Sequence, residues 1–251
     1  MINLLKYLTL AISLIVVMGC KEEKEDQNPP LIVATSADYP PFEYYSDTEI
    51  VGFEIDLIKA IAAELKRDVK IQDLSFDSIL GALQSKRVDL SISGISATPE
   101  REKVVDFSIH YNSSRTVVVT SDPSIKEMAD FKNKAIGVQM GSTYESCMRD
   151  WQTKITEMHI QSLTKVPDLI QSLKVGRIAG IALGLTEAKA LVAEIKNLKM
   201  IDIPDTEVSY AIALPKGSLL TKEINLVIEK FKKDGTLESI QNKWFKEKVS
   251  H

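Results

Sequence analysis

The sequence predicts an α/β protein with largely parallel sheets, divided into two lobes. Three observations lead to this prediction. Short apolar runs of strand length alternate with segments whose apolar residues recur at helical spacing. This alternation begins near Leu31 and starts again at Lys134, which indicates two α/β units. About 220 residues follow residue 30, enough for one large domain or two small ones.

The first unit alternates strands and helices. Residues 52–66 and 78–86 are expected to be helices, because their apolar side chains repeat at intervals of three and four. Residues 31–35, 69–74 and 88–93 are short, mainly apolar runs and are expected to be strands. Such an order is typical of a sheet covered by helices.

The second unit repeats the pattern, and two further strands lie at the borders of the units. The expected strands are 134–140 and 178–183, with 115–120 and 210–214 at the borders. The expected helices begin near 142 and cover 166–175 and 186–195. Residues 218–245 are expected to form two amphipathic helices that are broken at Asp234-Gly235, because glycine suits the left-handed position that ends a helix.

The first twenty residues are typical of a secretory signal. Lys6 precedes an apolar run over 7–18, which is too short to span a bilayer as a stable helix. The run ends at Val-Met-Gly-Cys20, which resembles the bacterial lipobox. We therefore expect residues 1–19 to be removed, Cys20 to carry lipid, and the charged residues 20–30 to form a flexible tether to a membrane. A plain signal peptide or an N-terminal anchor is the alternative.

Composition disfavours several classes of function. The chain holds 31 Lys and Arg against 35 Asp and Glu, and residues 1–19 contribute one lysine and no acid, so the mature chain has 30 against 35, a net charge of −5. A mildly acidic chain argues against nucleic acid as a partner. The three histidines show no metal-ligand spacing, and we expect neither a metal nor a cofactor. If Cys20 carries lipid, Cys147 has no disulfide partner, and it is expected to be a small buried apolar residue.

Three expected strand ends carry polar residues, and ligands of open α/β sheets bind beyond the carboxyl ends of the strands. The first end follows Thr35, where Ser36 and Tyr39 precede two prolines that fix an extended path. Tyr39 could be held there at a cleft wall. A proline-stiffened surface loop is the alternative.

The second strand end offers an anion-binding side chain. Ser93 and Ser96 supply hydroxyls, and Gly94 leaves room for a ligand to approach the backbone. Thr98, followed by proline, predicts a helix start. Arg101 carries a planar fork that matches a carboxylate in two hydrogen bonds. A surface salt bridge is the alternative for Arg101.

The third strand end leads into a helix. Ser142 and Glu145 have the spacing of a capping box, which predicts a helix start at this point. Free N–H groups at a helix N-terminus attract an anion such as a carboxylate. A simple strand–helix turn is the alternative.

Several motifs in one order resemble the extracellular solute-binding proteins, family 3, of ABC importers for polar amino acids. The resemblance covers residues 31–245 and implies a two-lobed periplasmic-binding-protein fold of type II, with a mixed, mostly parallel sheet flanked by helices in each lobe. The motifs are ADYPPFE at 37–43, VGFEIDL at 51–57, GISATPER at 94–101, VDFS at 105–108, GVQMGST at 137–143, DGTL at 234–237 and KWF at 243–245.

The resemblance implies an organisation and a partner. Lobe 1 would comprise 31–110 plus 211–248, lobe 2 would comprise 116–205, and two hinge crossings would lie near 111–115 and 206–210. The protein would be a monomer in the periplasm or cell envelope, anchored by lipid. It would close by hinge motion on an amino acid or related carboxylate and deliver it to an ABC permease.

The resemblance also implies a set of ligand-binding residues. Arg101 would bind the α-carboxylate of the ligand, and Ser142 and Thr143 would add hydrogen bonds from lobe 2. Tyr39 and Phe76 would pack on the ligand side chain. The remaining members of the set are Ser36, Ser93, Gly94, Ser96 and Gly184.

Two positions depart from the pattern of the family. Many relatives place an aspartate where this chain has Gly184, and that aspartate pairs with the ammonium group of the ligand. A buried ammonium without an acid is costly, so Glu187 is a candidate substitute. Alternatively, the ligand is not a standard α-amino acid or binds weakly. Ser36 stands where several relatives carry an aspartate that reads a basic or polar side chain, which weakens the case for arginine, lysine or histidine.

Two other functions are compatible with the same fold. One is an enzyme of the prephenate or arogenate dehydratase type, which needs a proton donor or acceptor in the cleft. Glu43 and Glu187 are the acids available for that role, and the cleft segments lack histidine. The other is a sensor that reports a solute to a membrane kinase through a partner protein.

Overall fold

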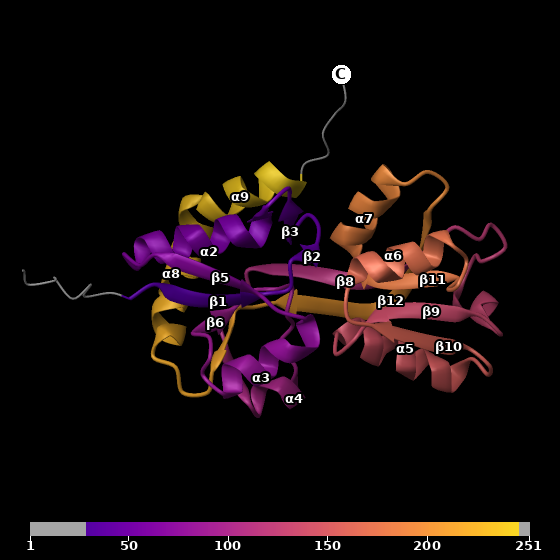
Figure 1. Ribbon diagram of the computed structural model, residues 1–251, viewed down its shortest axis with the longest axis horizontal. Coiled ribbons are helices and arrows are strands. Elements are labelled where there is room, and N and C mark those ends of the chain that lie inside the picture. The colour runs from indigo at the N-terminus through magenta and orange to yellow at the C-terminus, as the bar shows by residue number, and fades with distance from the viewer. Residues whose placement is uncertain (1–28, 246–251) are drawn as a thin grey trace, which may run out of the picture.

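The computed structural model describes residues 29–245, and it consists of two lobes lying side by side (Figure 1). Each lobe has one five-stranded sheet with helices on both of its faces. The expected signal peptide, the lipid-bearing Cys20 and most of the tether lie outside the described residues. Within 29–245, no helix is long and apolar enough to cross a membrane, and no group of His, Cys, Asp or Glu is arranged to hold a metal ion.

The first lobe contains both ends of the described chain. Its sheet has the order β5-β1-β6-β13-β7, in which β5, β1 and β6 are parallel and β13 runs antiparallel to β6 and β7. The strands are β1 (Leu31–Thr35), β5 (Val69–Asp73), β6 (Leu90–Ser91), β7 (Val105–Phe107) and β13 (Ala213–Pro215). The helices are α2 (Phe53–Glu64), α3 (Ile79–Gln84), α4 (Pro99–Glu102), α8 (Leu220–Asp234) and α9 (Thr236–Phe245).

The second lobe repeats the arrangement. Its sheet has the order β10-β9-β11-β8-β12, in which β10, β9 and β11 are parallel and β8 runs antiparallel to both β11 and β12. The strands are β8 (Asn112–Thr120), β9 (Ala135–Gln139), β10 (His159–Leu163), β11 (Gly180–Gly184) and β12 (Lys199–Tyr210). The helices are α5 (Thr143–Lys154), α6 (Val166–Lys174) and α7 (Leu185–Glu194).

Strands β8 and β12 connect the lobes. They pair from Asn112 opposite Tyr210 to Thr120 opposite Lys199, with a shift in register between Asp202 and Glu207. The stretches 111–115 and 206–210, which are the predicted hinges, fall at the end of this pair that adjoins the first lobe. A two-stranded connection allows the lobes to rotate against each other while most of each sheet stays rigid.

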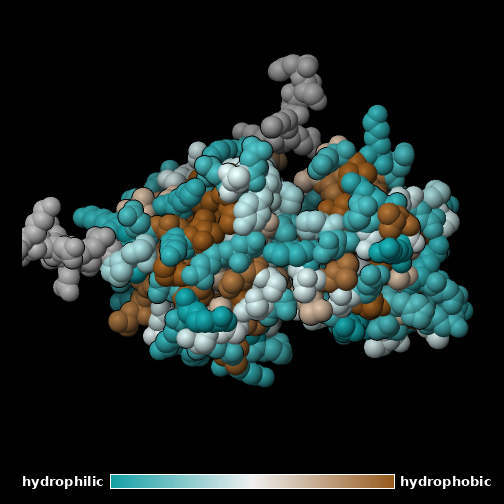
Figure 2. All heavy atoms as spheres, in the orientation of Figure 1, coloured by the Kyte–Doolittle hydropathy of each residue, from teal (hydrophilic) through white to brown (hydrophobic). Residues whose placement is uncertain are grey.

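An aromatic cluster in the first lobe packs the C-terminal helix α9 against Phe42 and the first residue of α2. Phe42 and Phe53 meet edge to face with ring centroids 5.7 Å apart, and Phe245 lies 5.0 Å from Phe42 and 4.7 Å from Phe53. Phe42 also meets Tyr210 edge to face at 5.6 Å. Because Tyr210 ends β12, this cluster links the loop that contains Phe42 to the connection between the lobes. On the face seen in Figure 2, hydrophilic side chains cover much of both lobes and the junction between them.

Most predicted elements are confirmed, and several bounds are corrected. The break at Gly235 is confirmed, with φ at 82°. The expected strand 210–214 was wrong, because β12 ends at Tyr210 in one sheet and β13 begins at Ala213 in the other. An apolar run that crosses between two buried sheets looks like one strand, since burial continues across the break. The strand expected over 88–93 shrinks to Leu90–Ser91. A three-stranded meander was missed, consisting of β2 (Asp38–Tyr39), β3 (Glu43–Ser46) and β4 (Glu49–Val51).

Candidate ligand-binding cleft

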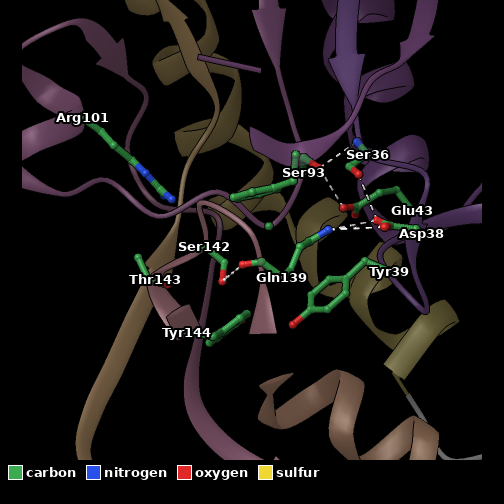
Figure 3. Close-up of a pocket in the computed structure, with 12 residues that line it drawn as sticks. Ser36, Asp38, Tyr39, Glu43, Ser93, Arg101, Gln139, Ser142, Thr143 and Tyr144 are labelled. Carbon is green, nitrogen blue, oxygen red and sulfur yellow. Dashed lines mark hydrogen bonds between the residues drawn. The ribbon is translucent and has the colours of Figure 1, made fainter. Parts of the chain in front are cut away.

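The candidate site is a narrow pocket between the two lobes (Figure 3). Arg101 lies on one side of it, and Ser36, Asp38 and Glu43 lie on the other. Its free volume is about 10 Å³, close to the space of a single water molecule, so side chains of the two lobes contact each other across the cleft. The lining residues are Ser36, Asp38, Tyr39, Glu43, Phe76, Ser93, Gly94, Arg101, Gln139, Ser142, Thr143 and Tyr144.

Arg101 is a buried cation on the short helix α4. The Thr98 hydroxyl caps this helix by accepting from the Arg101 amide at 3.3 Å, with Pro99 at its first turn, as predicted. The side chain is 8% exposed and lies over the ring of Phe76, 5.7 Å from its centroid. Burial lowers the pKa of Arg101 to about 10, so the guanidinium stays charged at neutral pH.

The guanidinium of Arg101 reaches across the cleft. It donates to the carbonyl oxygen of Ser96 at 2.7 Å and to that of Gly141, in the second lobe, at 2.9 Å. Both partners are neutral, and no ion pair between residues 29 and 245 involves Arg101. A buried charge without a counter-ion is unfavourable, so this position favours an incoming anion.

The second lobe presents the N-terminus of α5 to Arg101. The Ser142 hydroxyl accepts from the Glu145 amide at 3.1 Å and donates to the carbonyl oxygen of Gln139 at 2.7 Å. The predicted capping box is only half formed, because the Glu145 carboxylate accepts from the amide of Gly141 rather than from that of Ser142. Thr143 lines the pocket at the first turn of the helix. The free amides of this turn are suited to a carboxylate.

Two buried glutamates lie under the polar loop of the first lobe. The Ser93 hydroxyl accepts from the Ser36 amide at 2.9 Å and donates to Glu43 at 3.1 Å. Glu54 accepts from the Gly94 amide at 2.9 Å and from the Tyr111 hydroxyl at 2.6 Å. The Ser93 hydroxyl hydrogen is therefore used within the protein, and the glutamates fix the backbone that faces the cleft.

The two glutamates also influence each other's ionisation. Burial raises the pKa of Glu43 well above its usual value, and the neighbouring charge of Glu54 adds to the rise. Burial also raises the pKa of Glu54, although its hydrogen bonds oppose the rise. Two neighbouring carboxyls in a buried site favour holding a shared proton.

Asp38 joins the lobes directly. Its carboxylate accepts from the amide of Val166, the first residue of α6, at 3.0 Å and lies 3.3 Å from the amide nitrogen of the Gln139 side chain. Lys165, next in the chain, pairs with Asp73 of the first lobe at 3.3 Å. We call these contacts of Asp38, Asp73, Gln139, Lys165 and Val166 the interlobe latch.

Replacing Asp38 with asparagine is expected to weaken closure of the lobes. The change removes the charge that caps α6, an interaction typically worth ~1 kcal/mol. Because closure and ligand binding are linked, the affinity for a cleft ligand should fall about fivefold in calorimetric titration. Asp68→Asn, at an exposed position, is the matched control. An unchanged affinity in Asp38→Asn would show that the latch has no part in closure.

Of the remaining predicted residues, Ser36 and Tyr39 line the pocket, whereas Ser96 and Gly184 are not among its lining residues. Ser36 is buried, and its hydroxyl donates to Asp38 at 3.0 Å. The hydroxyl of Ser96 is buried without a hydrogen-bond partner among residues 29–245. Tyr39 crosses the cleft, and its hydroxyl accepts from the amide of Gly184 at 3.0 Å.

Sequence reasoning missed Asp38, Gln139 and Tyr144 as cleft residues. The first two lie inside motifs that were recognised, ADYPPFE and GVQMGST. Their neighbourhood could have identified them, since residues two apart on a strand share a face. Cys147, expected to be buried, is half-buried and packs against the core, and burial raises its pKa.

Comparison with known proteins agrees with this architecture. The profile of the bacterial extracellular solute-binding proteins, family 3, matches residues 31–247. The chain belongs to this family. This solute-binding protein is therefore related to binding proteins of ABC transporters.

Individual relatives of this solute-binding protein match most of its length. It is 36% identical to the arginine-binding extracellular protein ArtP of Bacillus subtilis, over 88% of each chain. It is 29% identical to the L-cystine-binding protein TcyJ of Escherichia coli, over 94% of this chain and 92% of the other. The structure of an ancestral arginine-binding protein bound to arginine matches with a TM-score of 0.82 and 36% identity, covering 86% of this chain and 98% of the other.

Proposed function

We propose that this protein captures an amino acid between its lobes, outside the inner membrane, and delivers it to an ABC permease. The observation that carries the proposal is the buried guanidinium of Arg101, which faces the N-terminus of α5 and, among residues 29–245, donates its hydrogen bonds to carbonyl oxygens. A carboxylate placed there would gain two charge-assisted hydrogen bonds and the amides of a helix turn. The relatives named for arginine and cystine binding support an amino acid as the ligand.

Binding would be coupled to closure. A pocket of about 10 Å³ is far too small for an amino acid, so the lobes must separate for a ligand to enter. In the ligand-bound closed form, side chains that contact each other across the cleft must also move aside. We infer that lobe 1 (31–110 plus 211–248) and lobe 2 (116–205) rotate about 111–115 and 206–210, with β8 and β12 as the connection. A ligand that contacts both lobes then shifts the equilibrium toward the closed form.

The end of the pocket away from Arg101 would receive the ligand side chain. Tyr39 supplies an aromatic wall there, and Ser36, Asp38 and Gln139 supply polar atoms, while Phe76 packs under the guanidinium of Arg101. This mixture of aromatic and hydrogen-bonding groups suits a polar amino acid. We expect the binding protein to act as a monomer, since both walls of the pocket come from one chain.

Uptake tests the proposed function. Cells of the source organism that lack the gene should lose the import of one or a few radiolabelled amino acids, and the intact gene should restore it. The complementing gene with Arg101→Ala should fail to restore uptake although the protein is made. Equal uptake of all labelled amino acids with and without the gene would contradict a role in import.

The anchor is a separate part of the proposal. The lipobox-like stretch ending at Cys20 would place the protein on the outer side of a membrane as a lipoprotein, with residues 20–30 as the tether. Growth with a labelled fatty acid should label the intact protein, and Cys20→Ala should remain unlabelled. Labelling of both, or of neither, would contradict lipidation at this cysteine.

A further inference from the structure

Glu187 is a buried carboxyl that takes no part in the hydrogen bonds of Arg101, Asp38 or Ser142. It lies in the first turn of α7, directly after the end of β11, and is 3% exposed. Neither of its carboxylate oxygens has a hydrogen-bond partner among residues 29–245. A buried carboxyl without such partners is costly, and the sequence keeps it beside the candidate cleft.

Gly184 makes room for this carboxyl. A Cβ atom built at Gly184 would collide with Oε2 of Glu187 and would lie 2.7 Å from the Tyr144 hydroxyl and 2.8 Å from the Tyr210 hydroxyl. The carboxyl of Glu187 therefore fills the space that a side chain at position 184 would need. A side chain at position 184 would therefore require the Glu187 carboxyl to move from its present place.

Among the described residues, hydroxyl oxygens surround the carboxyl and no cationic side chain acts on it. The hydroxyls of Tyr144 and Tyr210 bond each other at 2.7 Å, and both lie beside Gly184. The Tyr39 hydroxyl reaches the same place by accepting from the Gly184 amide. Tyr39 and Tyr144 also line the pocket that contains Arg101. A single small molecule could thus contact Arg101 at one point and this cluster of oxygens at another.

We propose that the carboxylate of Glu187 binds the ammonium group of the ligand, so that the cleft selects zwitterionic amino acids over deaminated carboxylates. This inference rests on the proposed function and specifies its substrate class. A primary ammonium carries three N–H donors, which suits a carboxylate surrounded by hydroxyl oxygens. Ser96 forms a backbone bridge with Tyr210, and its buried hydroxyl has no hydrogen-bond partner among residues 29–245.

Proton release should accompany binding. Burial raises the pKa of Glu187 to about 8, and the charge of Glu54 on α2 adds to the rise. The other titratable groups that face it are the hydroxyls of Tyr39, Tyr111, Tyr144 and Tyr210. At pH 7 the free carboxyl is therefore mostly protonated. An arriving ammonium favours the carboxylate, so Glu187 gives up its proton to the solvent.

Calorimetric titration of the purified protein tests the inference. The probes are the twenty standard L-amino acids and the 2-oxo acid that has the same side chain as the tightest binder. At pH 7, in two buffers of different ionisation enthalpy, the wild type should release most of one proton per amino acid bound. Glu187→Gln should bind that amino acid about 30-fold more weakly or worse and release no proton. The 2-oxo acid should bind both proteins equally.

Control variants separate the inference from structural damage. Glu194→Gln lies on the same helix at an exposed position and should behave as the wild type. Glu187→Asp keeps the charge on a shorter side chain and should bind between the wild type and Glu187→Gln.

Two outcomes distinguish a failure of the role of Glu187 from a failure of the proposed function. If the wild type binds an amino acid but Glu187→Gln binds it within threefold, with the same proton release, the role of Glu187 is overturned and the proposed function stands. If the wild type binds no amino acid, the proposed function itself fails.

Discussion

Replacing Arg101 with alanine is expected to abolish amino-acid binding while the protein remains folded. The guanidinium is buried and charged, and its two partners are carbonyl oxygens, so only a bound anion would neutralise it. Removing one member of a buried, hydrogen-bonded charge pair costs about 2–5 kcal/mol, which corresponds to an affinity loss of roughly 30-fold to several thousandfold. Calorimetric titration of wild type and Arg101→Ala with the same amino acid measures this loss.

Two further variants define what Arg101 contributes. Arg101→Lys keeps the charge but loses the planar fork, so it should bind more weakly than the wild type and better than Arg101→Ala. Arg177→Ala removes an exposed arginine of the second lobe and should bind normally. Because Arg101→Ala deletes an uncompensated buried charge, its unfolding temperature should not fall sharply. An affinity within fivefold of the wild type would exclude Arg101 from the carboxylate site.

The second large effect is expected in the dependence of stability on pH. Burial raises the pKa values of Asp38, Glu43, Glu54 and Glu187 above their ordinary values. Between the unfolded and folded pKa values, the folded chain binds more protons than the unfolded chain. The free energy of unfolding must therefore fall as the pH rises through this window. For Glu187 the window runs from 4.5 to about 8.

The size of this effect can be stated for Glu187 alone. A rise in pKa from 4.5 to about 8 corresponds to a loss of about 4 kcal/mol of stability across the window. Carboxyls with lowered pKa values, such as Asp106 and Glu145, change the stability only below pH 4.5, so they do not oppose this loss of stability. Urea unfolding at pH 5, 6, 7 and 8 should show a steady decline. The slope should be shallower in Glu187→Gln and unchanged in Glu194→Gln. A flat or rising profile in the wild type would contradict buried, neutral carboxyls.

Local signals were sufficient to predict much of the fold. The start of α4 at Thr98 and the break at Gly235 follow from residue types that prefer those backbone positions. Strand bounds were less predictable where burial continues through a connection, as between Tyr210 and Ala213. The three-stranded meander starting at Asp38 was missed because its strands are only two to four residues long.

Several residues of the candidate site could be predicted from the sequence, but the contacts between them could not. Arg101 and the polar residues after β6 were singled out by their types together with the resemblance to the family, and Ser93, Gly94 and Arg101 line the pocket. The contact of Asp38 with Val166 joins residues 128 positions apart, and no local pattern in the sequence records such a contact. In the sequence, Gly184 could be recognised as lacking the aspartate of many relatives, and Glu187 could be named as a candidate substitute. That a side chain at position 184 would collide with the Glu187 carboxyl emerged from the fold.

Thermal unfolding of the purified protein against a panel of small molecules tests the central claim most directly. The panel contains the standard amino acids with their deaminated, decarboxylated and dipeptide relatives. A ligand at about 100 times its dissociation constant adds about 2.7 kcal/mol of stability, which should raise the unfolding temperature by about 5–10 °C. We predict that one or a few amino acids produce this shift, and that their deaminated and decarboxylated relatives produce much smaller ones. Stabilisation by deaminated acids alone, or by no member of the panel, would contradict the binding of an amino acid between Arg101 and Glu187.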